Sequence, residues 1–133
     1  MAKPIIIKNI ISNYKKKIIV DGDKSLSIRF ALLASQATGT SKAYNLLKSE
    51  DVLSTLNCLK KLGVKVRWSK QSKYCEIKGN GLNSYVYKDN LTLNGNNSGT
   101  CVRLLTSLLV NSPKKIKIVG DKSLSKRDMK RII

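Results

Sequence analysis

The sequence predicts an α/β (α+β) fold in which short strands alternate with amphipathic helices along 133 residues. Three observations predict it: apolar residues recur at helical spacing, short runs rich in β-branched residues separate these segments, and one eight-residue motif occurs twice. A chain of this length can bury one core but not two full domains. The order of elements gives one β-α-β-α-β-β unit and the opening of a second, incomplete unit.

The first unit is expected to begin with strands at 4–8 and 17–20 and a turn at 21–23. A helix follows over 25–37, ended by Gly39. Its buried face would consist of Leu26, Phe30, Leu33 and Ala37. A strand at 40–46 then leads to a second helix with Ser49 as its N-cap. The buried stripe of that helix would be Val52, Leu56, Leu59 and Leu62.

The remaining elements rest on the same kinds of signal. Runs at 64–68 and 74–78 predict a hairpin, and 85–87 and 91–93 predict short strands. A third helix is expected over 99–110, with Val102, Leu105 and Leu109 on one face. A strand at 115–119 precedes a fourth helix over 127–133 that carries no stop signal. We therefore expect a chain that is cut short inside its second unit.

The repeated motif supports this division into units. Gly22-Asp23-Lys24-Ser25-Leu26-Ser27-Ile28-Arg29 and Gly120-Asp121-Lys122-Ser123-Leu124-Ser125-Lys126-Arg127 are identical at seven of eight positions. Each copy follows an apolar strand and precedes a helical pattern. The alternative is two turns that share only their capping chemistry.

The charge, the cysteines and the lack of histidine exclude several classes of function. The formal charge of +18 fits an anionic partner, but a general bias toward Lys explains it as well. Three distant cysteines without Cys-x-x-Cys spacing, in a chain without His, give no zinc site and indicate reduced thiols in a cytoplasmic setting. No apolar run is long enough for a membrane span. The absence of His also excludes Ser-His and Cys-His nucleophiles.

The first copy of the motif is a candidate phosphate site. Lys24 and Ser25 stand at a predicted helix start, where free N–H groups attract phosphate, and Arg29 follows on the same face. The alternative is that Ser25 is only an N-cap and Lys24 only a solvated charge.

A second candidate is the polar turn at 94–100, which runs directly into an apolar helix with Arg103 one turn inside. Its Asn97, Ser98 and Thr100 could donate hydrogen bonds to a ligand, and Gly99 would let the ligand approach the backbone, although the turn lacks the Walker pattern. The alternative is an Asn-rich loop with a Ser or Thr cap. In the second copy of the motif, Asp121 and Asp128 flank the basic pair Lys126-Arg127 and could orient it or compete for it. Cys58 and Cys101 are expected to be packing residues rather than nucleophiles.

In order, the chain carries Gly-Asp-Lys-Ser-Leu-Ser-x-Arg, Asn-Ser-Gly-Thr-x-x-Arg-Leu-Leu and Gly-Asp-x-Ser-Leu-x-Lys-Arg. Together these motifs resemble the 5-enolpyruvylshikimate-3-phosphate (EPSP) synthase family. Related UDP-N-acetylglucosamine enolpyruvyl transferases usually carry Asn where Ser25 stands. The resemblance covers nearly the whole chain but only about the first third of a family member. It implies two domains of three units each, as inside-out α/β barrels. Residues 1–18 would be a strand segment crossing to the other domain, and residues 19–133 part of the N-terminal domain.

The resemblance also implies chemistry. Family members transfer the enolpyruvyl group of phosphoenolpyruvate to shikimate 3-phosphate as cytoplasmic monomers, with no metal or cofactor. Shikimate 3-phosphate would be bound by Lys24, Ser25 and Arg29, and phosphoenolpyruvate by Lys24, Asn97, Gly99, Thr100, Arg103 and Arg127. The acid-base carboxylates are expected beyond residue 133, so this chain alone is expected to be inactive. Departures from the family pattern are Asp21 and Asp128, where Pro is usual, and Ile28, where a polar residue is common.

Two other functions remain open at this stage. The charge would suit a small nucleic-acid-binding module, although the sequence lacks an aromatic stacking platform and a recognition-helix motif. The chain could also be a degenerate remnant of the enzyme.

Overall fold

The computed structural model describes residues 21–69, 74–130 and 132. The strands predicted at 4–8 and 17–20, and the crossing segment 1–18, lie outside these residues. In chain order the elements are α1 (Lys24–Gln36), β1 (Thr38–Tyr44), α2 (Glu50–Lys61), β2 (Lys65–Ser69), β3 (Tyr74–Asn80), β4 (Leu91–Asn94), α3 (Gly99–Leu109), β5 (Ile116–Val119) and the 3₁₀ turn η1 (Leu124–Lys126).

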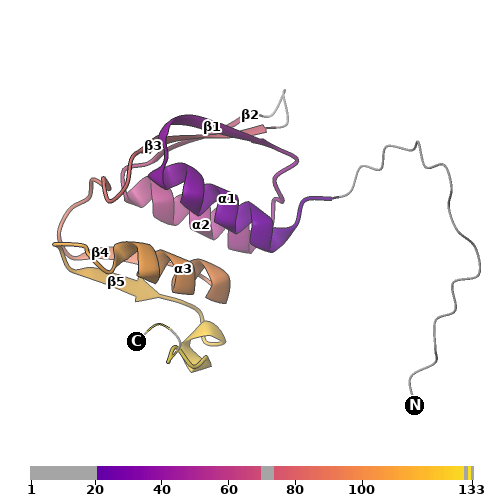
Figure 1. Cartoon of the computed structure of the whole chain (residues 1–133). Helices are drawn as coiled ribbons and strands as arrows, with labels where there is room; N and C mark the ends of the chain where they lie inside the picture. Colours follow the sequence, from indigo (N-terminus) through magenta and orange to yellow (C-terminus); the bar gives the residue numbers. More distant parts are fainter. Residues whose placement is uncertain (1–20, 70–73, 131, 133) are drawn as a thin grey trace, which may run out of the picture.

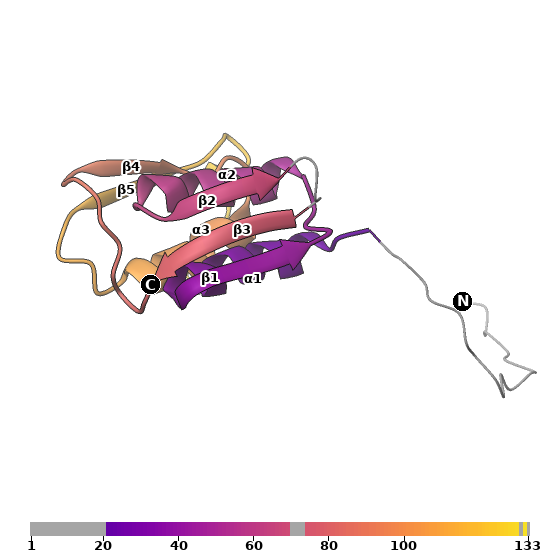
Figure 2. The same ribbon diagram turned by 90° about the horizontal axis from the view of Figure 1, so that it is seen from above.

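The strands form two small sheets on either side of the helices. β3 pairs antiparallel with both β1 and β2, so the first sheet has the order β1-β3-β2. β4 and β5 form a parallel pair, with Leu91 opposite Ile116. Figure 1 shows α1 and α2 between the three-stranded sheet and α3. Viewed from above, the sheet covers α1 and α2 (Figure 2). The predicted mixed α/β class is therefore confirmed.

The second helix forms as its sequence predicts. The Ser49 hydroxyl accepts a hydrogen bond from the Val52 N–H, and acidic residues fill the first turn while Lys60 and Lys61 fill the last. These charges complement the helix dipole at both ends. The predicted stripe is buried: Val52, Leu56, Leu59 and Leu62. Local capping and period thus determine this element.

The first helix forms where predicted, but its predicted buried face is wrong in its two leucines, although Phe30 packs half-buried against the core. Leu26 and Leu33 are 68% and 71% exposed, whereas Ile28 is fully buried. The buried face consists of Ser27, Ile28, Ala31, Leu32, Ala34, Ser35 and Gln36. Small residues there let the helix approach β3 so closely that a Cβ at Gly79 would lie 2.3 Å from the Ala34 carbonyl oxygen. Close packing of small groups selects this face over the larger leucines.

Two further predictions are wrong. The segment 85–87 forms no strand, because its hydrogen bonds go elsewhere: the Val86 N–H donates to the Leu62 carbonyl, and Ser35 bonds the Tyr85 hydroxyl at 2.8 Å. Among the described residues after 126 there is no helix; η1 ends at Lys126 and Arg127 has extended backbone. Of the described residues that follow, Arg127, Asp128 and Lys130 are exposed and only Met129 and Ile132 are half-buried, so little apolar surface is left for a helix to pack.

One core joins the elements. It contains buried residues from α1, α2, β3, β4 and α3, among them Ile28, Leu59, Ile77, Leu93 and Leu105. Cys58 and Cys101 belong to it, which confirms the packing role predicted for both. Within the part of the chain that the structure describes, no helix is long and apolar enough to cross a membrane.

Candidate functional site

The three helices begin at the same end of the molecule (Figure 1, right-hand side). Lys24 at the start of α1 forms an ion pair with Asp51 at the start of α2, with 2.9 Å between Nζ and Oδ2. The Ser54 hydroxyl oxygen, one turn into α2, lies 3.5 Å from the carbonyl oxygen of Gly95 just before α3. Each helix start carries unpaired N–H groups and a partial positive charge. Three such termini therefore face one region, which we call the N-terminal face.

The start of α1 differs from both readings of the sequence. Asp23, not Ser25, is the N-cap: its carboxylate accepts from the Leu26 N–H at 2.7 Å. Ser25 lies in the first turn, and within residues 21–69 and 74–130 its hydroxyl makes no hydrogen bond. Lys24 is ion-paired rather than merely solvated. The Ser25 hydroxyl is thus available to a ligand, and Lys24 already has one partner.

The turn before α3 is a well-defined structure. Ser98 caps the helix by accepting from the Cys101 N–H at 3.2 Å, and the Asn96 N–H donates to the Asn94 side chain at 2.9 Å. Asn96 has a positive φ of 47°, which Asn tolerates better than most residues. The Gly95 N–H donates to the Val119 carbonyl at 2.8 Å, which ties the turn to the end of β5. Ser98 is therefore occupied as a cap, while Thr100 follows in the first turn of the helix.

Three predicted site residues meet at the start of α3. The Arg127 guanidinium donates from Nη2 to the Asn97 side-chain oxygen at 2.6 Å. It also lies over Gly99, where an added Cβ would be 2.9 Å from Nη1. A side chain at this position would displace the guanidinium from the start of α3. We call Asn97, Gly99 and Arg127 the arginine cluster; it combines a planar cation with a helix N-terminus, both of which favour an anion.

Arg103 stands apart from this cluster. Its Nη2 donates to the Asp128 carbonyl at 3.0 Å, and its Nε is a buried nitrogen without a partner among the described residues. In this arrangement Arg103 fixes the segment after Arg127.

Neither aspartate of the second motif competes for Arg127. The Asp121 carboxylate accepts from the Leu124 N–H at 2.7 Å, and the Asp128 carboxylate accepts from the Lys130 N–H at 2.8 Å. The Asp121 N–H also donates to the Asn96 carbonyl at 2.9 Å, which binds the motif to the turn before α3. The two aspartates therefore shape the backbone around the arginine cluster, and within the described ranges no carboxylate forms an ion pair with Arg127.

Burial keeps the thiols from acting as nucleophiles, although the hydrogen bond with Cys58 lowers the pKa of the fully buried Cys101 thiol. All three cysteines are buried. Burial raises the pKa of the Cys75 thiol to about 11. A hydrogen bond with Cys101, and then burial, raise the pKa of Cys58 far above its ordinary value. Among the described residues, no cluster of three or more His, Cys, Asp or Glu side chains could hold a metal ion.

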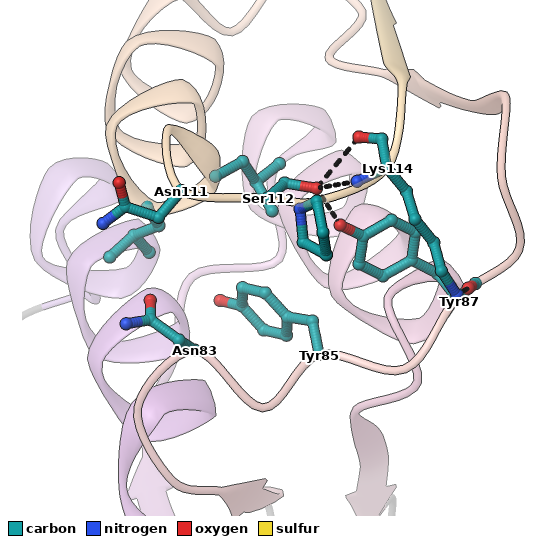
Figure 3. A pocket seen from close by; sticks show the side chains of 9 residues that line it. Asn83, Tyr85, Tyr87, Asn111, Ser112 and Lys114 are labelled. Carbon is teal, nitrogen blue, oxygen red and sulfur yellow. Dashed lines mark hydrogen bonds between the residues drawn. The ribbon is translucent and has the colours of Figure 1, made fainter.

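A cavity of about 120 Å³ lies at the opposite end of the helices, and none of the predicted site residues lines it. Figure 3 shows Tyr85 and Tyr87 beside Ser112 and Lys114 there. The Lys114 ammonium donates to the Tyr87 carbonyl at 2.7 Å and stands 5.5 Å from the ring centre, while the Tyr87 hydroxyl bonds Ser112. Tyr87, Ser112 and Lys114 thus contact one another, and the side chains of Asn83 and Asn111 also line the cavity.

A hollow of about 400 Å³ adjoins the arginine cluster instead. Arg127 lines it with Val102, Ile118, Val119, Gly120, Leu124, Ser125 and Met129. One participant at the N-terminal face was not predicted from the sequence: Asp51, in the first turn of α2. Acidic residues are common at helix starts because they complement the helix dipole, so the sequence alone does not mark Asp51 as a site residue.

Comparison with known proteins gives one consistent family. The family model described as EPSP synthase (3-phosphoshikimate 1-carboxyvinyltransferase) matches residues 8–133. The 3-phosphoshikimate 1-carboxyvinyltransferases of Streptococcus pyogenes serotypes M2 and M1 are each 44% identical over 117 residues, covering 87% of this chain and 26% of the relative. The EPSP synthase from Acinetobacter baumannii has a similar structure, with a TM-score of 0.74, 36% identity and the same coverage of 87% and 26%. The chain thus spans about a quarter of the length of these relatives.

Proposed function

Because the chain belongs to the EPSP synthase family, we propose that it forms part of the substrate site of a 3-phosphoshikimate 1-carboxyvinyltransferase. That enzyme would transfer the enolpyruvyl group of phosphoenolpyruvate to shikimate 3-phosphate. The observation that carries the proposal is the arginine cluster, in which Arg127 lies over Gly99 at the start of α3. In this proposal residues 19–133 are one β-α-β-α-β-β unit and part of a second in an inside-out α/β barrel, and residues 1–18 reach the other domain.

Phosphoenolpyruvate would bind at the arginine cluster. Arg127 would present its free N–H groups to the ligand's oxyanions, and the backbone N–H groups of Gly99 and Thr100 would add the helix start. Asn97 orients the guanidinium through its 2.6 Å hydrogen bond. Arg103 would support the pocket from behind. Each charged hydrogen bond contributes on the order of 1.5–3 kcal/mol, so two or three suffice for a small anion.

Shikimate 3-phosphate would bind at the start of α1. The Ser25 hydroxyl and the exposed Arg29, one turn further along α1, would contact its phosphate. Lys24 would reach both ligands, since its side chain is 51% exposed and stands between the starts of α1 and α2. The two ligands would then lie side by side across the N-terminal face.

Turnover needs more than these contacts. Addition and elimination of the enolpyruvyl group require acid-base carboxylates, which we expect outside residues 1–133, and enclosure of both ligands from water. We therefore propose that this chain alone binds ligands without measurable turnover. The full-length protein would work as a cytoplasmic monomer without a cofactor or metal. Three buried free thiols are compatible with that reducing compartment.

Isothermal titration calorimetry of the 133-residue chain with phosphoenolpyruvate tests the proposal. We expect weak binding, weakened about tenfold or more by Arg127→Ala, because a charged hydrogen-bond donor is lost. Lys114→Ala is the matched control, since it removes a cation at the opposite end and should leave the affinity unchanged.

Absence of heat from a folded chain, or equal losses in both variants, would contradict the proposal. Tight, salt-sensitive binding of DNA or RNA, unaffected by Arg127→Ala, would favour the nucleic-acid-binding alternative instead.

A further inference from the structure

The ion pair between Lys24 and Asp51 is the least expected contact at the N-terminal face. Asp51 Oδ2 lies 2.9 Å from the Lys24 ammonium nitrogen, and the two side chains are 19% and 51% exposed. The carboxylate is thus mostly shielded from water, while about half of the lysine surface remains open. An ion pair with one shielded member is screened less than a pair on the open surface.

Asp51 is held rigidly for this contact. Its backbone carbonyl accepts hydrogen bonds from the Ser54 hydroxyl at 2.9 Å and the Thr55 hydroxyl at 2.8 Å. The next residue, Val52, is fully buried and donates to the Ser49 cap. The carboxylate therefore projects from a fixed point, whereas Lys24 carries its charge on a flexible four-carbon stem.

We propose that Asp51 is a positioning residue that holds the Lys24 ammonium at the junction of α1 and α2, ready for an anionic ligand. An ammonium has three donors, and Asp51 uses one, so the others stay available to ligand oxygens. Ordering the lysine before binding lowers the entropy cost of binding. This inference rests on the proposed function, because it takes phosphoenolpyruvate as the ligand of Lys24.

The direction in which Asp51→Asn changes ligand affinity distinguishes positioning of Lys24 from electrostatic repulsion between Asp51 and the ligand. A carboxylate close to an anionic ligand repels it, so removing the charge should tighten binding if repulsion were the whole effect. If Asp51 positions Lys24, Asp51→Asn should weaken binding although the change in charge favours it. Glu50→Gln is the matched control: it removes the same charge from the adjacent, exposed position in the first turn of α2.

The test is calorimetric titration of phosphoenolpyruvate into the 133-residue chain and its variants. We expect Asp51→Asn to weaken binding about five- to tenfold and Asp51→Glu to restore part of the loss. Glu50→Gln should leave the affinity equal or slightly tighter. In a Lys24→Ala background, Asp51→Asn should weaken binding no further, since the group that it positions is gone.

Each outcome decides the matter. Unchanged or tighter binding by Asp51→Asn, with normal binding by the parent chain, overturns the positioning role alone. No binding by the folded parent chain overturns the proposed function and this inference together. Should Asp51→Asn fail to fold, Asp51→Glu decides: it keeps the charge at the start of α2 but displaces the carboxylate, and an affinity equal to that of Glu50→Gln contradicts positioning.

Discussion

The two copies of the eight-residue motif begin alike and end differently. Asp23 and Asp121 each accept a hydrogen bond from the N–H three residues later, both at 2.7 Å. In each copy the backbone carbonyl of that aspartate also accepts an N–H from the residue four positions later, at 3.0 Å. Yet the first copy opens a helix of 13 residues, and the second opens a 3₁₀ turn of three. The capping chemistry is the same, so it cannot be what decides the length.

The packing after the cap decides it. The first copy continues into residues that bury a face against α2 and β3, beginning with Ile28, whereas the second places Lys126 in the equivalent position, exposed. The leucine at the fifth position of the motif shows the opposite pattern of burial: Leu26 is 68% exposed in the first copy, and Leu124 is only 3% exposed in the second. Nucleating a turn is costly, and tertiary burial is what extends it into a helix. The motif therefore encodes a capped turn that presents a cation, and its surroundings determine the rest.

The largest predicted difference lies at the one position where the copies differ. Ile28→Ala should lower the free energy of unfolding by about 3 kcal/mol, because it leaves a cavity in the core. Lys126→Ala should change it by less than about 0.5 kcal/mol, since the side chain is exposed. Urea denaturation of both variants measures the difference. Similar losses would mean that η1 packs as tightly as α1.

The next largest predicted difference in stability comes from replacing the glycine that begins each copy of the motif. A Cβ at Gly22 would lie 2.3 Å from the Asn45 carbonyl oxygen, a backbone atom, whereas at Gly120 it would lie 2.3 Å from the Leu124 side chain. Rotation of the Leu124 side chain relieves part of the clash at Gly120, although the Leu124 Cβ would also lie 2.8 Å away, whereas the backbone at Gly22 cannot rotate away at all. Gly22→Ala should cost about 3 kcal/mol and Gly120→Ala about 1–2 kcal/mol, as for other overpacked sites. Thermal unfolding of the two variants would contradict this ranking if Gly120→Ala were the worse.

Alkaline pH should weaken the core on which the first copy packs. Burial raises the pKa of Cys75 on β3 from 9.0 to about 11. Between these values the unfolded thiol is ionised and the folded thiol is not, so stability is complete below pH 9 and falls as pH rises toward 11. The stability lost over this range is about 3 kcal/mol, since each pKa unit corresponds to about 1.4 kcal/mol. Denaturation curves of the parent chain and Cys75→Ala between pH 9 and 11 measure the part of the stability loss that this thiol causes. If both chains lost stability equally over this range, the raised pKa of Cys75 would be contradicted.

The caps should give the smallest effects. Asp23→Ala should cost about 1 kcal/mol, because it removes the cap of a long packed helix. Asp121→Ala should cost about half as much in global stability, since only a short turn depends on it. Urea denaturation measures both; a larger loss for Asp121→Ala would indicate that the second motif supports the core as strongly as the first.

Much of the fold could be predicted from the sequence because its signals are local. α2 and α3 follow from their Ser caps and apolar periods. The buried face of α1 could not be predicted, because Ile28 and Leu32 compete with Leu26 and Leu33, and the choice depends on how closely distant Gly79 approaches. The strand predicted at 85–87 failed for the same reason: hydrogen bonds to residues distant in the sequence outweigh the β propensity of this short segment.

The candidate site was predictable in its residues but not in its contacts. The motifs single out Lys24, Gly99 and Arg127, yet Arg127 and Asn97 meet across 30 residues of sequence. The pairing of Lys24 with Asp51 likewise depends on how α1 packs on α2. Spacing along a helix predicts neighbours one turn apart, but it says nothing of partners on another element.

Amide NMR of the ¹⁵N-labelled chain during titration with phosphoenolpyruvate would locate the anion site directly. We expect the amides of 98–101 and 24–26 and the Arg127 side chain to shift together along one binding curve, and Arg127→Ala to remove the response. Shifts confined to the amides around Tyr85 and Lys114, or none at all in a folded chain, would contradict an anion site at the N-terminal face.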